Sequence, residues 1–335
     1  MYLESTREIH LASRPVGLPT AANFELITVP VRPLQAGEVL IKNLWMSVDP
    51  YMRGRMMDRE SYVPPYKLQE ALEGGAVGEV VESRSETIKV GDLVLHQLGW
   101  REHAVAPAAS VQKIDARQAP PQAFLGVLGM TGMTAWAGLT RIAELKAGET
   151  VFVSAASGAV GAVAVQIAKQ MGARVVASVG SDEKAAWLRE IGADAVINYR
   201  TAGDLTAALR AAAPEGINVY FENVGGAHLE AALNVMKPFG RVIMCGMIEV
   251  YNATEPPKGP SNLAQVIGKR IKLQGMIVSD HFGAYPEFLK QVGGWLAAGK
   301  IQTRETVREG LDNAPDAFIG LFRGDNTGKM LVKLA

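Results

Sequence analysis

Hydrophobic positions follow two different patterns along the chain. From about Leu11 to Ala123, short Val-, Ile- and Leu-rich runs are separated by glycine and proline turns, which is typical of short β-strands. From about Gly126 onward, stretches with helical apolar spacing alternate with short Val/Ile runs. That alternation indicates a parallel sheet with helices on both faces. The pattern therefore predicts an α/β protein with a mainly β part followed by a doubly wound part.

The second part contains six apolar runs that predict strands, with helical stretches between them. The predicted strands are 150–155, 173–179, 194–199, 218–224, 240–246 and 271–278. The predicted helices are 159–172, 182–193, 204–213, 227–240 and 262–270, followed by a helix at 285–300 and a last strand at 328–334. In the first helix, apolar residues recur at helical spacing from Val160 to Met171, and Gly172 is expected to end it.

Size and composition limit the class of protein. A chain of 335 residues exceeds the usual size of a single hydrophobic core, so two domains are expected. Lys and Arg balance Asp and Glu at 34 each, which gives no support for nucleic acid as a partner. No window has 18 uncharged apolar residues and no apolar signal core is seen, so we expect no membrane span and a cytoplasmic location.

A glycine turn joins the first predicted strand of the second part to its helix. The turn Ala156-Ser157-Gly158-Ala159-Val160-Gly161 fits the dinucleotide-binding pattern except at its first position, which is alanine. Gly158 would let the backbone approach a pyrophosphate, and Gly161 would let the helix lie close to the strand. The helix N-terminus would offer N–H groups to the phosphates. The alternative is a tight turn that binds nothing.

The turn after the second strand indicates which dinucleotide is bound. NAD-type sites place an acidic residue ~20 positions after the glycines, where it holds the ribose 2′-hydroxyl. The stretch from Ser178 to Ser181 holds no acid, so a 2′-phosphate would not be repelled. Ser181 is expected to be a helix N-cap, and Lys184 stands one turn further on, within reach of a phosphate. These residues favour NADPH, although Lys184 as a solvated surface lysine is the alternative.

Motifs spread over nearly the whole chain carry a family resemblance. They are VDPYMRGRM (48–56), GMTGMTAWAGL (129–139), SAASGAVG (154–161), GSDEK (180–184), INYR (197–200), FENVGG (221–226), CGMIEVYN (245–252) and GDNTGKMLVK (324–333). With them the chain resembles the zinc-free medium-chain dehydrogenases/reductases, and within these the NADPH-dependent alkenal, prostaglandin and curcumin double-bond reductases. The resemblance implies a GroES-like β domain (1–124, completed by 301–335), a Rossmann domain (125–300) and NADPH between them.

The resemblance also implies roles for individual residues. The coenzyme phosphates are assigned to Gly158, Ala159, Val160 and Gly161, and the 2′-phosphate side to Ser181, Lys184 and Tyr199. Asn223 is expected near a ribose, and Thr134 near the carboxamide. The nicotinamide half is assigned to Cys245, Gly246, Met247, Ile248, Tyr251, Met276, Ile277 and Val278, with Asn326 reaching across from the tail. A homodimer is a further expectation from resemblance.

The sequence gives no support for a zinc site. Zinc-dependent relatives carry a Gly-His-Glu motif, whereas the corresponding stretch here, LEGGAVGEVVE (72–82), has no histidine. Cys245 is the only cysteine, so a four-cysteine lobe cannot form. The five histidines are not paired at metal-ligand spacing, and we expect each to be a surface or core residue: His10, His96, His103, His228 and His281.

Reduction of a C=C bond, which the resemblance implies, fits a site without a metal. A hydride added to the β-carbon of an α,β-unsaturated ketone or aldehyde builds negative charge on the enolate oxygen, which a hydroxyl donor would stabilise. Tyr251 is the first candidate donor and Tyr51 the second. Both have a structural alternative, and a ribose hydroxyl or water is another proton source. The competing functions are an NADPH quinone reductase and a non-catalytic NADPH-binding regulator.

Overall fold

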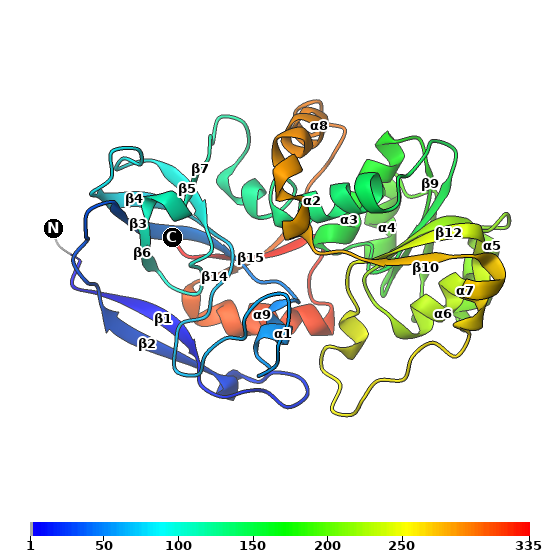
Figure 1. Cartoon of the computed structure of the whole chain (residues 1–335), viewed down its shortest axis with the longest axis horizontal. Coiled ribbons are helices and arrows are strands. Elements are labelled where there is room, and N and C mark those ends of the chain that lie inside the picture. Colours follow the sequence, from blue (N-terminus) through cyan, green and yellow to red (C-terminus); the bar gives the residue numbers. More distant parts are fainter. Residues whose placement is uncertain (1–2) are drawn as a thin grey trace. The chain divides into compact units, whose positions relative to one another are not determined.

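A computed structural model describes residues 3–335 as two compact units. The first comprises the chain up to Leu125 together with Glu305–Ala335, and the second comprises Gly126–Arg304. Figure 1 shows that the C-terminal segment, coloured red, returns beside the blue strands of the first unit. The last residues therefore complete a structure that the first residues begin.

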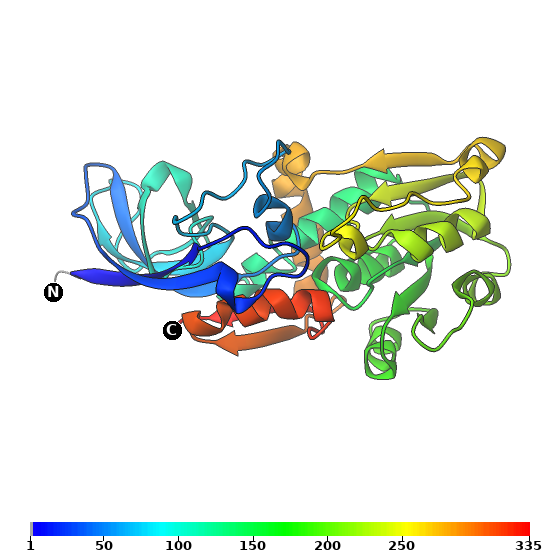
Figure 2. The ribbon, with the colours of Figure 1, turned by 90° about the horizontal axis from the view of Figure 1, so that it is seen from below.

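A seven-stranded sheet forms most of the first unit, in the order β14-β15-β3-β4-β5-β7 with β6 paired to β3. Strands β1 and β2 form a separate antiparallel pair. Helix α9 lies alongside β14 (Figure 2), where Arg308 and Asp316 are 3.9 Å apart. The elements are β1 (Ser5–Leu11), β2 (Phe24–Pro30), β3 (Glu38–Ser47), α1 (Met52–Arg55), β4 (Ala76–Ser83), β5 (Leu93–His96), β6 (His103–Pro107), β7 (Gln112–Lys113), β14 (Glu305–Glu309), α9 (Ala314–Arg323) and β15 (Lys329–Lys333).

The core of the first unit joins its two chain segments. The Trp100 ring packs edge-on against Phe318 of α9, with 6.1 Å between ring centroids, and stacks on Phe24. Trp100 and Phe318 are fully buried. Because large aromatic side chains bury much apolar surface, this contact holds the C-terminal helix on the β structure.

A six-stranded parallel sheet forms the second unit, in the order β10-β9-β8-β11-β12-β13. This is the Rossmann order, which confirms the predicted fold class of a doubly wound sheet beside a mainly β part. The elements are α2 (Met130–Ala137), β8 (Thr150–Val153), α3 (Ala159–Gln170), β9 (Arg174–Val179), α4 (Asp182–Glu190), β10 (Ala195–Asn198), α5 (Leu205–Ala212), β11 (Ile217–Glu222), α6 (Gly226–Val235), β12 (Met236–Met244), α7 (Ala264–Lys269), β13 (Lys272–Gly275) and α8 (Tyr285–Ala297).

Helix boundaries agree with the sequence pattern at α3 but not at α6. Helix α3 ends at Gln170 and Gly172 has a φ of 79°, so Gly172 stops the helix as expected. The helix predicted for 227–240 instead ends at Val235, and β12 begins at Met236. Pro238 cannot continue the ladder of helix hydrogen bonds, and Phe239 has a φ of 63°. The prediction of helix for 236–240 was therefore wrong.

Candidate functional site at the carboxyl edge of the parallel sheet

Four of the predicted coenzyme residues follow neighbouring strands of the second unit. Gly158 follows β8, Ser181 follows β9, Tyr199 follows β10 and Asn223 follows β11. The strand order reverses between β8 and β11. Open α/β sheets bind ligands beyond the carboxyl ends of their strands at such a reversal, so these residues share the expected edge.

The glycine turn has no room for larger side chains. A Cβ on Gly161 would lie 2.5 Å from the Ala155 carbonyl oxygen and 2.7 Å from the Ala156 Cα atom. Gly158 is the N-cap of α3 and provides no side-chain cap, so the first N–H groups of the helix have no side-chain acceptor there. Ala155 has a φ of 45°, a conformation that alanine rarely adopts. The turn therefore fits a pyrophosphate, whose oxygens would accept from these groups.

The turn after β9 supports the predicted 2′-phosphate side. The Ser181 hydroxyl accepts from the Lys184 N–H at 3.3 Å, which confirms Ser181 as an N-cap. A Cβ on Gly180 would lie 2.7 Å from the Tyr199 hydroxyl and 3.2 Å from Arg200 Nε. Glycine at 180 therefore lets Tyr199 and Arg200 approach the turn. The Ser178 hydroxyl is buried and has no hydrogen-bond partner among residues 3–335.

The Tyr199 ring packs against the buried side chain of His228. Its centroid is 5.1 Å from that of His228, and the rings meet edge to face. Burial lowers the pKa of His228 to about 4, so the imidazole is neutral at physiological pH. His228 therefore belongs to the core, one of the two settings expected for it, and supports a residue of the predicted site.

The loops after β12 and β13 carry the residues assigned to the nicotinamide half. The Cys245 and Gly246 N–H groups donate to the Glu222 carbonyl at 3.1 and 3.0 Å. The Tyr251 hydroxyl accepts from the Met247 N–H at 3.3 Å, and a Cβ on Gly246 would lie 3.2 Å from that hydroxyl. The Tyr251 hydroxyl therefore lies over the loop it belongs to. Loop residues Ile248 and Met276–Val278 follow the same two strands.

Three predicted site residues lie on other elements. Thr134 is in α2, where its hydroxyl donates to the Met130 carbonyl at 2.8 Å. Tyr51 and Asn326 belong to the first unit. Burial, with the nearby Asp49 charge, raises the pKa of Tyr51, so Tyr51 stays protonated. Asn326 donates to the Gly328 carbonyl at 2.8 Å.

A buried polar cluster under this edge was not predicted from the sequence. Ser154, Tyr220 and Glu222 are all fully buried. The Glu222 Oε1 atom accepts from the Tyr220 hydroxyl at 2.7 Å and from the Ser154 hydroxyl at 3.1 Å. An acid at the last position of a mostly apolar parallel strand, INVYFE (217–222), was the available signal, because such strands are buried on both faces.

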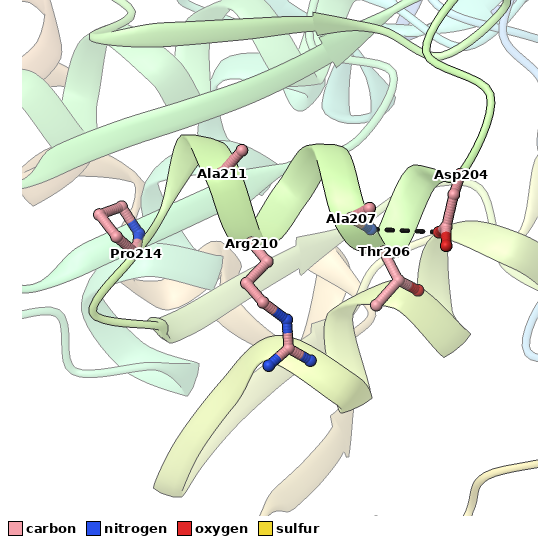
Figure 3. A pocket seen from close by; sticks show the side chains of 6 residues that line it. All are labelled: Asp204, Thr206, Ala207, Arg210, Ala211 and Pro214. Atoms are coloured by element: carbon pink, nitrogen blue, oxygen red, sulfur yellow. Dashed lines mark hydrogen bonds between the residues drawn. The ribbon is translucent and has the colours of Figure 1, made fainter.

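A surface hollow of about 590 Å³ lies along α5 and holds none of the predicted site residues (Figure 3). Its lining comes from α5 and its two ends: Asp204, Thr206, Ala207, Arg210, Ala211 and Pro214. In Figure 3 the Arg210 side chain extends away from its helix. We therefore do not place the coenzyme there.

Comparison with known proteins identifies the family. Residues 7–114 match the family described as the N-terminal domain of oxidoreductase, and residues 159–293 match that described as zinc-binding dehydrogenase. YfmJ of Bacillus subtilis is 48% identical over 99% of this chain and 98% of its own length. The chain belongs to the medium-chain dehydrogenase/reductase family. This confirms the resemblance seen in the sequence.

Two further members of the medium-chain dehydrogenase/reductase family are closely similar. The NADPH-dependent curcumin reductase of Escherichia coli is 42% identical over 97% of this chain and 96% of its own length. The crystal structure of CurA from Vibrio vulnificus in complex with NADPH has a TM-score of 0.94 and 42% identity, covering 98% of this chain and 99% of that one. Of this chain, 98% is therefore matched by a structure of the same fold that holds NADPH.

The description matched by residues 159–293 names zinc, and a zinc site needs a group of metal-ligating side chains. Residues 3–335 contain no group of three or more His, Cys, Asp and Glu side chains that could hold a metal ion. The residues present therefore do not fit a zinc centre of the usual four-ligand kind. In the same part of the chain, no helix is both long enough and apolar enough to span a bilayer.

Proposed function

We propose that this chain is an NADPH-dependent reductase of the C=C bond of α,β-unsaturated ketones or aldehydes, acting by hydride transfer to the β-carbon without a metal. The main observation behind the proposal is the site at the carboxyl edge of the sheet. There the glycine turn after β8 and the turn after β9, which has no acid from Ser178 to Ser181, fit NADPH. The names of relatives support the substrate class, because they include a curcumin reductase and the NADP-dependent 2-alkenal reductase of Nicotiana tabacum.

In this proposal the second unit holds the coenzyme at both ends. The first turn of α3, from Gly158 to Gly161, donates N–H groups to the pyrophosphate. Ser181, Lys184 and Tyr199 surround the 2′-phosphate, where the Lys184 ammonium supplies the opposite charge. Asn223 lies beside a ribose. Loop residues 245–248, Tyr251 and 276–278 flank the nicotinamide, with Thr134 and Asn326 as further contacts.

The chemistry assigned to the protein is stabilisation of charge on the substrate oxygen. Bound NADPH supplies a hydride. Tyr251 donates a hydrogen bond to the oxygen on which enolate charge grows, and this bond strengthens as the charge develops. The α-carbon then takes a proton, which completes the saturated product. Tyr51, held protonated by burial, is the second candidate donor, and no step is assigned to a metal.

Loss of reduced-nicotinamide absorbance tests this proposal. The purified protein is mixed with NADPH and a panel of enones and enals, and separately with a panel of quinones. We expect oxidation with the first panel and a saturated product by mass spectrometry. Oxidation with quinones only would identify a quinone reductase. Tight NADPH binding without oxidation of either panel would identify a binding protein.

We further propose that two copies of a cytoplasmic chain pair through the β13 edge of the sheet. The outer side of β13 has no neighbouring strand among residues 3–335. Leu273 on β13 and Ile267 on α7 are 36% and 81% exposed, as expected of surfaces that a partner covers. The variant L273K should sediment as a monomer if this edge is the interface.

Cytoplasmic location is supported by the single cysteine, which fits a reducing compartment.

A further inference from the structure

One oxygen of Glu222 collects hydrogen bonds from two different loops of the site. Oε1 accepts from the Val224 N–H at 2.6 Å and the Gly225 N–H at 2.9 Å, both in the loop after β11. It also accepts from the Ser154 hydroxyl at 3.1 Å, and Ser154 begins the glycine turn after β8. The other oxygen, Oε2, has no partner among residues 3–335.

Ser154 and Asn223 make the link between the two loops direct. The Asn223 N–H donates to the Ser154 hydroxyl at 2.9 Å, and the Asn223 side-chain amide donates to the Ser154 carbonyl at 2.8 Å. The Tyr220 hydroxyl lies 3.0 Å from the Ser154 hydroxyl as well as 2.7 Å from Oε1. The position of Asn223 is therefore set relative to the glycine turn by three side chains below it.

Burying this polar cluster lowers the free energy of unfolding, whereas apolar side chains in the same places would not. A buried carboxyl loses its hydration, and one with an unpaired oxygen recovers only part of it. Burial raises the pKa of Glu222, although the loop N–H groups and the two hydroxyls oppose that rise. The Glu222 charge acts on Cys245 and on Tyr220, and the Glu249 charge also acts on Tyr220. A costly group in this place indicates a role beyond packing.

We propose that Glu222, with Ser154 and Tyr220, is a positioning residue for the coenzyme. Its Oε1 atom fixes the glycine turn and the Asn223 loop in one mutual arrangement, so that the pyrophosphate and ribose contacts form together. It does not itself touch the coenzyme. This inference rests on the proposed NADPH site, and it concerns only the pyrophosphate and ribose half of that site.

Binding of two ligands to the coenzyme-free protein separates this role from a merely structural one. NADPH spans both halves of the site, whereas adenosine 2′-monophosphate meets only the Ser181, Lys184 and Tyr199 side. In E222D the side chain is one methylene group shorter, so the carboxylate oxygen lies further from the groups that donate to it. We expect its NADPH Kd to rise about tenfold or more, while its adenosine 2′-monophosphate Kd stays within about twofold. Calorimetry measures both constants.

Two comparisons complete the experiment. E222Q keeps an acceptor oxygen at the Oε1 position, so it should bind NADPH closer to the wild type than E222D does. E215D changes an exposed glutamate in the turn before β11 and should change neither constant. If E222D does not fold, Y220F removes one hydroxyl donor with little change of shape and should weaken NADPH binding selectively.

The outcomes differ for the two hypotheses. An unchanged NADPH Kd in E222D, or in Y220F where that variant replaces it, would overturn the positioning role. So would an equal loss for both ligands, because a general loss of structure would affect both halves of the site. A wild-type protein that binds neither ligand would instead refute the proposed NADPH site.

Discussion

Lys329 and Asp49 form a buried ion pair, with 2.8 Å between Nζ and Oδ1 and side-chain exposures of 5% and 6%. Lys329 is in β15, and Asp49 precedes Tyr51 in the DPYMRG turn. Lys329 also donates to the Val48 carbonyl at 3.0 Å, and the Ser47 hydroxyl donates to Asp49. The ion pair therefore holds β15 against the turn that contains Tyr51.

Removing one charge of this pair should destabilise the first unit. K329M leaves the Asp49 carboxylate buried without its cation, which typically costs about 3–5 kcal/mol of unfolding free energy. Urea unfolding measures the change. The matched control is K67M, because Lys67 pairs with Glu70 at 76% and 59% exposure, and surface pairs contribute about 0–1 kcal/mol. Equal effects in the two variants would contradict the prediction.

Lys184 should determine the choice between NADPH and NADH. K184A removes a charge near the proposed 2′-phosphate, so we expect NADPH affinity to fall about tenfold and NADH affinity to stay unchanged. Calorimetry with both coenzymes measures the ratio. K300A, at an exposed lysine after α8, is the control. A preference for NADPH that survives in K184A would show that Lys184 is a surface residue.

Tyr251 should affect turnover more than coenzyme binding. Y251F removes the hydroxyl that accepts from the Met247 N–H and that is proposed to stabilise the enolate. Loss of one such donor lowers kcat about 10²- to 10³-fold in well-studied cases, whereas the NADPH Kd should change little. Steady-state kinetics and calorimetry give the two values. Intact turnover would move the donor role to Tyr51, a ribose hydroxyl or water.

His96 should make the fold sensitive to mild acid. Its Nδ1 accepts from the Leu98 N–H at 3.1 Å, so Nε2 carries the hydrogen that is donated to Asn43 at 2.9 Å. Burial, helped by the Arg101 charge, lowers the pKa of His96 to about 4. The unfolded residue titrates near ~6.5. As pH falls from about 6.5 to about 4, only the unfolded chain gains a proton, and about 3 kcal/mol of stability is lost.

The variant H96Q tests this pH dependence. Glutamine can accept and donate in the same place but does not titrate, so its unfolding free energy should fall less between pH 7 and pH 4.5. Denaturant unfolding at several pH values gives the slope. An identical slope in H96Q and the wild type would assign the acid sensitivity to other groups, of which buried His228 is the first, because its pKa is also lowered to about 4.

Local patterns were sufficient to predict most of the fold. The Val/Ile runs correspond to β8–β13, and the glycine turn stands between β8 and α3 as its spacing indicates. The end of α6 was missed because the apolar spacing continues into β12, although Pro238 was a visible signal. Residue spacing was also enough to predict Ser181 as an N-cap, since that contact joins residues three positions apart.

The contacts that escaped prediction join distant parts of the chain. Ser154 and Glu222 are 68 positions apart, and Asp49 and Lys329 are 280 apart. A single sequence does not reveal which polar residue will meet which, because the folded backbone brings them together. The residue types alone indicate only that a partner must exist. Here they are an acid at the end of a buried strand and a lysine at the start of another, Glu222 and Lys329.

The pairing of β15 with β3 has a consequence for synthesis on the ribosome. β15 lies opposite Trp45–Ser47, so that part of β3 has no partner on this side until β15 has been translated. The whole second unit is made in the interval, and it can fold first. Shielding of the nascent β3 edge by a chaperone would then prevent strand exchange between neighbouring chains, and a polypeptide truncated before β15 would be released with that edge open.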